Sequence, residues 1–190
     1  MGAVWGGRNM HPIEILAEEH RLIRQALDSF SLATHKMEQG INPPAEFFEK
    51  AVEFARTFID KRHHFKEEYL MFGRLAERHQ GELDAQIEAL RHQHDHGREF
   101  ISEMANALGG YSKGKDAQVT DMLENLASLV TLYRHHIHRE DRIFFPMVEK
   151  SLPQQELDDL AELFTKEDEK TGPDTFDRMR RLVDELVTLL

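Results

Sequence analysis

The sequence predicts an all-α protein: an up-down-up-down four-helix bundle followed by two additional C-terminal helices. Apolar residues recur at alternating steps of three and four along four long stretches, which is the spacing of one buried helix face. Turn signals separate these stretches, and strand-like alternation of useful length is absent from the sequence. We therefore expect a bundle over residues 12–150 and a C-terminal helical extension over 153–190 that packs on it.

The first helix is expected to begin at Pro12, because the missing N–H of a proline would have no intrahelical partner in a first turn. Gly40 marks its end. Asn42 and Pro43 predict the cap and the first position of the second helix. The polar stretch that follows Gly73 predicts that this helix ends or loosens there.

The third helix is expected to start near Glu82, and the glycine-rich stretch 109–115 predicts a loop. The fourth helix has the most regular apolar face and carries Pro146 in its last turns, where we expect a kink or an end. Residues 153–168 predict a short acidic helix, which the Thr-Gly-Pro sequence at 171–173 breaks before a last amphipathic helix.

Composition excludes several classes of function. The chain has 190 residues, with 24 Lys and Arg against 35 Asp and Glu, a formal charge of −11 that repels nucleic acid. It contains no cysteine, which excludes disulfides, thiolate metal sites and thiol catalysis. No apolar run is long enough to span a membrane, and the start lacks the apolar segment of a signal peptide. We expect a cytoplasmic protein.

Seven polar residues occupy positions on the apolar faces where Leu or Ile would be expected. They are His20, His63, Glu67, His94, Tyr133, His136 and Glu140. Burying one imidazole without a partner costs roughly a few kcal/mol, and an unpaired carboxylate costs more. Metal coordination would compensate for this cost. Taken singly, His20 and His94 are better explained as hydrogen-bonded core residues, and the His63/Glu67 pair is equally well explained as an ordinary i,i+4 contact.

The level of these residues along the bundle favours the metal. His20 and His63 lie almost equally far from the turn near residue 42, and Glu67 and His94 are comparably far from the turn near residue 79. The match for His136 is looser, since the preceding loop is long. In an antiparallel bundle these residues reach one level. The predicted metal ligands are therefore His20, His63, Glu67, His94, His136 and Glu140.

The other histidines are assigned to different roles. His92 and His96 lie about 200° around the helix from the third apolar face and point away from it. His64 and His135 lie about 100° off their faces, and we expect them beside the ligands or on the surface. The remaining ones are expected in solvent: His11, His35, His79 and His138.

Three more residues flank the predicted site. Glu68 and Asp141 each follow a ligand position by one residue, and exposed charge is the favoured interpretation of both. Tyr133 lies one turn before His136, and a core tyrosine bonded elsewhere is favoured over one that reaches the site.

Four motifs, EEHRLI, HHFKEEYLMF, HDHGREF and HHIHREDRIFFP, resemble the hemerythrin-like, or HHE cation-binding, family in order and spacing over residues 12–150. The tail resembles an extension of bacterial members. The resemblance implies a non-haem di-iron centre with two iron ions, bridged by Glu67 and Glu140. Each iron would also bind histidines from the set His20, His63, His94 and His136.

Two departures from the oxygen-carrying members matter for function. Their fifth histidine, one turn along the third helix, is Arg98 here. Their bridging aspartate corresponds to Asp141, whereas the apolar face favours Glu140. Six protein ligands leave about two open metal positions, which predicts rapid autoxidation and peroxide turnover more than reversible oxygenation.

We favour a module that binds O2 or NO for storage or sensing. An oxidoreductase that consumes peroxide or oxidises Fe(II) is the first alternative, so the sequence leaves open whether the protein is an enzyme. A structural metal such as zinc is the second. Imidazole and carboxylate donors suit manganese and zinc as well as iron.

Overall fold

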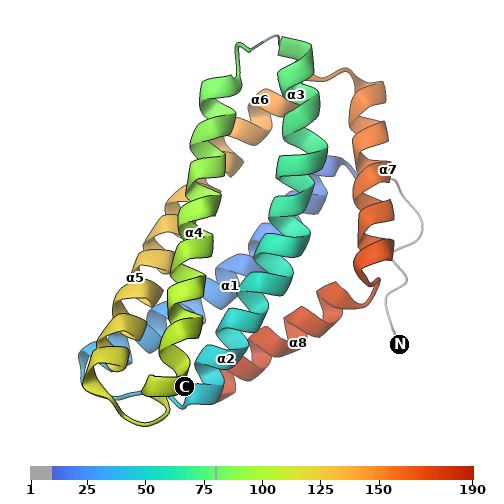
Figure 1. Cartoon of the computed structure of the whole chain (residues 1–190). Coiled ribbons are helices and arrows are strands. Elements are labelled where there is room, and N and C mark those ends of the chain that lie inside the picture. The colour runs from blue at the N-terminus through green and yellow to red at the C-terminus, as the bar shows by residue number, and fades with distance from the viewer. Residues whose placement is uncertain (1–9, 80) are drawn as a thin grey trace.

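The computed structural model describes residues 10–79 and 81–190, so most of the segment tested for a signal peptide lies outside the described residues. Four helical rods lie antiparallel in a bundle, and two further helices lie against it (Figure 1). No strand occurs in the described part of the chain. The predicted all-α four-helix bundle with two additional helices is confirmed. None of the described helices has the length and apolar character needed to cross a membrane.

The second rod starts later than expected. It is continuous through α2 (Ala45–Phe54), two π-helical segments and α3 (Phe72–His79). Pro44, not Asn42, caps it, because Asn42 and Pro43 each precede a proline, which disfavours the helical conformation. Gly73 lies inside α3, and the rod ends at His79, within the polar stretch where its end or loosening was predicted.

Three π-helical segments interrupt the rods that carry the His/Glu pairs. They are η1 (Ala55–His64), η2 (Lys66–Met71) and η3 (Glu140–Phe144). A π turn contains more residues than an α turn, so residues that a regular α-helix would turn outward can face the interior. Within η1, His63 and His64 are both buried, and Lys66 and Glu67 are both buried in η2.

The first rod is α1 (Pro12–Glu38), which starts at Pro12 as predicted. The third is α4 (Asp84–Tyr111), which extends into the predicted loop because the Tyr111 hydroxyl donates to the Pro43 carbonyl at 2.6 Å. The fourth comprises α5 (Asp116–Arg139), η3 and α6 (Phe145–Ser151). Pro146 lies in the first turn of α6, where its missing N–H costs little.

The C-terminal helices are α7 (Gln154–Thr171) and α8 (Thr175–Thr188). The first contacts α1 and η2, and the second contacts α1, α2 and η1. The bundle and these helices share two apolar clusters, one containing Phe164 of α7 and the other containing Met179 of α8. Along each rod, a layer of buried polar residues separates the two clusters.

Close packing of α4 on α5 yields a testable contact. A Cβ atom at Gly97 would lie 2.1 Å from the Tyr133 hydroxyl oxygen, and Tyr133 is buried. Gly97→Ala must therefore displace the ring, and we expect a loss of about 1–3 kcal/mol in the free energy of unfolding, measured by urea denaturation. Gly109→Ala in the same helix is the control, because its Cβ would meet no atom within 4 Å. Equal stabilities of the two variants would contradict this packing.

Candidate metal centre

The structure brings all six predicted ligands into one buried group at the polar layer. They come from all four rods, and each is at most 1% exposed: His20, His63, Glu67, His94, His136 and Glu140. Because the four rods each contribute at least one side chain, the group forms only when the bundle is complete.

The two carboxylates lie between the imidazoles. Glu67 places one oxygen 3.6 Å from Nε2 of His63 and the other 3.4 Å from Nε2 of His94. Oε2 of Glu140 lies 3.3 Å from Nε2 of His20 and 3.2 Å from Nε2 of His136. Each carboxylate thus connects histidines from two rods, which is the placement that a bridging ligand requires.

Two overlapping groups of donor atoms result. In each group, one ligand atom per residue lies within 4.8 Å of all the others, and Glu67 belongs to both. The first group is His20, His63, Glu67 and Glu140, and the second is His64, Glu67, His94 and His136. Either group could hold a metal ion.

The inward-facing atoms of this layer lack hydrogen-bonding partners. Nε2 of His20, Nε2 of His63 and both oxygens of Glu67 and Glu140 are buried without one among the described residues. Each such atom costs about 1–3 kcal/mol if it stays unpaired. These nitrogen and oxygen atoms carry lone pairs that divalent cations bind. The residues therefore fit a metal centre.

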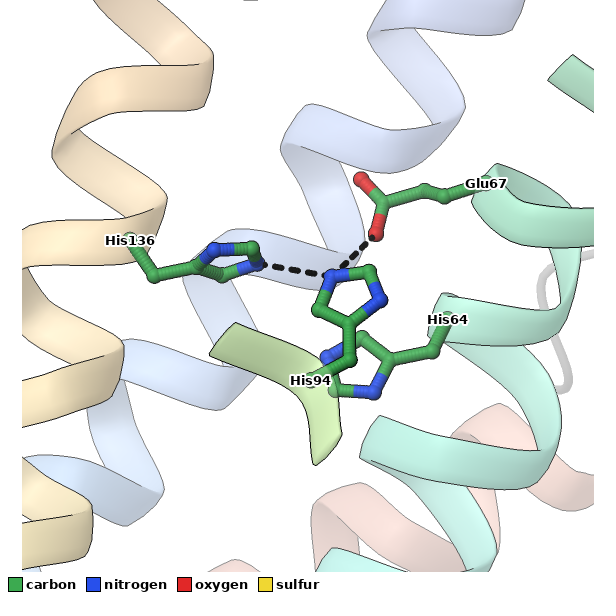
Figure 2. A group of neighbouring side chains, drawn as sticks. All are labelled: His64, Glu67, His94 and His136. Atoms are coloured by element: carbon green, nitrogen blue, oxygen red, sulfur yellow. Dashed lines mark hydrogen bonds and ion pairs between the residues drawn. The ribbon is translucent and has the colours of Figure 1, made fainter. Parts of the chain in front are cut away.

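The separation of two imidazoles supports the same conclusion. Nε2 of His94 and Nε2 of His136 lie 3.0 Å apart, and Figure 2 shows the two rings converging with Glu67 on one point. Two nitrogens at right angles on one metal, each about 2.1 Å from it, lie about 3 Å from each other.

The outward-facing nitrogens of His20 and His94 are bonded to carboxylates. Nδ1 of His20 donates to Asp141 at 2.7 Å, and Nδ1 of His94 donates to Glu68 at 2.6 Å. A carboxylate that accepts at Nδ1 leaves Nε2 unprotonated and available to a metal. The interpretation of Glu68 and Asp141 as simple exposed charges is therefore wrong, since each accepts a hydrogen bond from a histidine predicted as a ligand.

The remaining two histidines follow the same pattern with partners that the sequence analysis missed. Nδ1 of His63 donates to Glu19 at 3.1 Å, and Nδ1 of His136 donates to Gln93 at 2.8 Å. Glu19 directly precedes His20, and Gln93 directly precedes His94. This proximity to predicted ligands is the sequence signal that could have indicated their role.

His64 lies beside the predicted ligands, which is one of the two places expected for it. It is buried, and its ring stacks on His94 with centroids 3.7 Å apart (Figure 2). The π-helical backbone of η1 turns it inward together with His63. His135, the other histidine predicted off the face, is exposed.

Most other histidines lie where the sequence predicted. His92, His96, His35 and His138 are exposed, and His11 is partly exposed. The prediction for His79 falls on a side chain outside the described ones.

Arg98 occupies the position of the fifth histidine of oxygen carriers. Its guanidinium contacts Asp60 at 2.7 Å, Glu68 at 2.7 Å and Asp95 at 2.8 Å. These carboxylates hold Arg98 at the side of the bundle. There its guanidinium orients Glu68, which accepts the hydrogen bond from Nδ1 of His94.

Tyr133 lies closer to the site than the favoured interpretation suggested. Its ring centroid is 5.7 Å from that of His64 and 6.1 Å from that of His136. Its hydroxyl is buried without a hydrogen-bonding partner among the described residues, so it is not bonded elsewhere. Burial raises the pKa of Tyr133, which keeps the hydroxyl protonated.

Burial sets the charge of the layer. It lowers the pKa of His63 to about 4 and that of His136 to about 3, so these imidazoles are neutral near pH 7. Burial, reinforced by Glu140, raises the pKa of Glu67. Burial opposes ionisation of Glu140 too, but His136 and His20 hold its pKa below the usual value. Neutral imidazole is the form that binds metals.

Comparison with known proteins agrees with this site. The family described as the hemerythrin HHE cation binding domain matches residues 11–148, and the chain belongs to this family. Similar proteins include uncharacterized ones from Mycobacterium bovis and two strains of Mycobacterium tuberculosis, each 24% identical over 157 residues. The match covers 83% of this chain and 61% of each relative, so the chain spans less than two thirds of their length. No solved structure matches.

Metal removal is expected to destabilise the fold, because the unpaired inward atoms lose their counterpart. With free metal about 100-fold above its dissociation constant, one site contributes about 2.7 kcal/mol. For a chain of this size that corresponds to roughly 5–10 °C in the thermal midpoint. The measurement is thermal unfolding with and without a chelator. An unchanged midpoint would show that the polar layer is not coupled through a metal.

Histidines of the third rod provide a matched set of variants. We expect His94→Ala to lower the metal content per chain, because His94 is buried in the site. His92→Ala and His96→Ala should leave it unchanged, because both side chains are exposed on the same helix. Metal analysis of the three purified variants decides the point, and loss of metal from either control would show that the inward face of α4 is misassigned.

Proposed function

We propose that this chain is a non-haem di-iron protein that binds O2, NO or a related small oxidant inside its helical bundle, for storage or sensing. The observation that carries the proposal is the common orientation of four imidazoles. Each has Nδ1 on an outer acceptor: His20 on Asp141, His63 on Glu19, His94 on Glu68 and His136 on Gln93. Each Nε2 faces a shared carboxylate.

The donor set suits iron. Imidazole and carboxylate favour Fe(II), Mn(II) and Zn(II), and no thiolate is available to select a softer metal. In our assignment, His20 and His63 would hold one iron, and Glu67 and Glu140 would be ligands shared with a second one. When bound, such a pair supplies one- and two-electron chemistry toward small oxygen and nitrogen species.

His94 and His136 would hold the second iron, with His64 as its third imidazole. His64 lies in the same group of donor atoms, and the position of the missing fifth histidine, Arg98, is turned to carboxylates outside it. With His64 the protein ligands number seven, which leaves one open position by the count used above. A single open position favours binding over turnover, so the geometry supports the storage or sensing role.

Aromatic rings line the layer and limit the access of water. Phe145 stacks on His20 at 5.3 Å between centroids, and Phe72 lies 6.2 Å from His94 in a stacked orientation. Exclusion of water protects a bound oxidant from proton-driven side reactions.

One observation favours the second candidate, an oxidoreductase that consumes peroxide. The buried hydroxyl of Tyr133 keeps its proton, lacks a partner and belongs to a ring near His64 and His136. A hydroxyl in this place can donate a hydrogen bond or a proton to a reacting oxygen.

The optical spectrum and metal content of protein purified without added metal test the proposal. We expect two irons per chain and near-ultraviolet absorption from a bridged ferric pair. Zinc without such absorption would instead establish the structural-metal alternative.

Reversibility separates binding from turnover. Diferrous protein is mixed with O2 in a stopped-flow instrument and then purged with argon. We expect the wild-type chain to recover its diferrous spectrum over repeated cycles. His64→Ala should autoxidise at least about tenfold faster, because it opens a second position. His135→Ala is the matched control. His135 is adjacent in sequence to His136, as His64 is to His63, but its side chain is exposed. Rapid autoxidation of the wild type with peroxide turnover would favour the oxidoreductase.

A further inference from the structure

Four charged side chains form a buried cluster beside His63. Glu19 comes from α1, Arg62 from η1, Lys66 from η2 and Asp168 from α7. Lys66 is fully buried, and Glu19 and Arg62 are nearly so. The site assigned above uses none of them as a ligand.

Direct ion pairs link the four groups. Arg62 donates to Glu19 at 3.0 Å and to Asp168 at 2.7 Å. Lys66 contacts the same Glu19 oxygen, and its Nζ lies 2.6 Å from Asp168. Two cations therefore face two anions, and α7 supplies one of the anions.

Packing alone does not account for this cluster. Desolvation of buried ions offsets much of their attraction, and apolar residues of similar volume often stabilise a fold equally well. Removal of one member, however, leaves an uncompensated buried charge. The cluster therefore fixes the position of its charged groups in a way that an apolar contact would not.

Its link to the metal centre is Glu19. One oxygen of Glu19 accepts from Arg62 and Lys66, and the other accepts from Nδ1 of His63. Asp168 balances the two cations. Without Asp168, both cations would act on Glu19 alone and weaken it as an acceptor for His63.

The corresponding acceptors of the other histidines are arranged differently. Asp141, which holds His20, pairs with the exposed Arg24. Glu68, which holds His94, pairs with the half-buried Arg98. Both arrangements lie within the bundle, whereas the support of His63 is completed from outside it by α7.

We propose that α7 is a positioning element for the metal held by His20 and His63, with Asp168 acting through Lys66, Arg62 and Glu19 on His63. The C-terminal extension thereby controls the affinity of one of the two metals. This inference rests on the proposed two-metal centre.

Asp168→Asn in the full chain is the primary test, with Glu169→Gln as the matched control. Both substitutions remove one negative charge from neighbouring residues of α7, but Glu169 is exposed. The readout is Fe(II) affinity in an anaerobic competition with a chelator of known affinity. Loss of a supporting group outside the ligands typically weakens a metal site about 10–100-fold. We expect about tenfold weakening at one of the two sites for Asp168→Asn and none for Glu169→Gln.

Thermal midpoints distinguish this effect from a purely structural one. For Asp168→Asn, the gap between metal-loaded and metal-free midpoints should narrow. Equal falls of both midpoints with unchanged affinity would overturn the inference. The double variant Lys66→Met/Asp168→Leu keeps Glu19 and Arg62 as a balanced pair, so it should fold and recover most of the lost affinity. Failure of the folded double variant to recover it would also overturn the inference. A wild-type chain that binds no metal would instead refute the proposed function.

Discussion

The six predicted ligands, four imidazoles and two carboxylates, share one buried layer with His64, and the need to satisfy each of their polar atoms shapes the surrounding bundle. The outer half of this need is met by the protein, through acceptors that hold each Nδ1. The inner half is not, since the oxygens of Glu67 and Glu140 find no donor among the described residues. A cation at the centre would resolve the imbalance. Apolar clusters lie on both sides of the layer along the bundle.

Regular helical periodicity made much of this structure predictable. On α1, α4 and α5 the period of 3.6 residues placed His20, His94 and His136 inward, and each is buried. The spacing of four residues between His63 and Glu67, and between His136 and Glu140, identified the two carboxylates predicted as metal ligands. The level of these residues along the bundle followed from antiparallel topology.

The errors arise where the backbone leaves that period. In η1 and η2 a π-helical turn admits neighbouring residues to the interior, so His64 is buried beside the predicted ligands and Lys66 is buried at a position for which the sequence made no prediction. Glu68 and Asp141 were misassigned for a related reason. Each lies one position off the apolar face, and from there its carboxylate accepts a hydrogen bond from Nδ1 of a histidine on another rod. Contacts such as that of Asp168 with Lys66 join distant segments, and no local pattern encodes them.

The order in which the chain is synthesised gives the cluster around Glu19 a further meaning. His20 and its acceptor Asp141 are 121 residues apart, so the centre cannot assemble until the last rod of the bundle has been made. Asp168 follows later still, in a helix that must dock before Lys66 and Arg62 are neutralised. A growing chain whose four rods have been made would therefore hold the complete predicted ligand set with an unbalanced positive charge beside it, which would disfavour premature capture of a cation. Docking of α7 would remove that charge, so the predicted centre would become receptive to a cation only after a helix outside the four rods has been made.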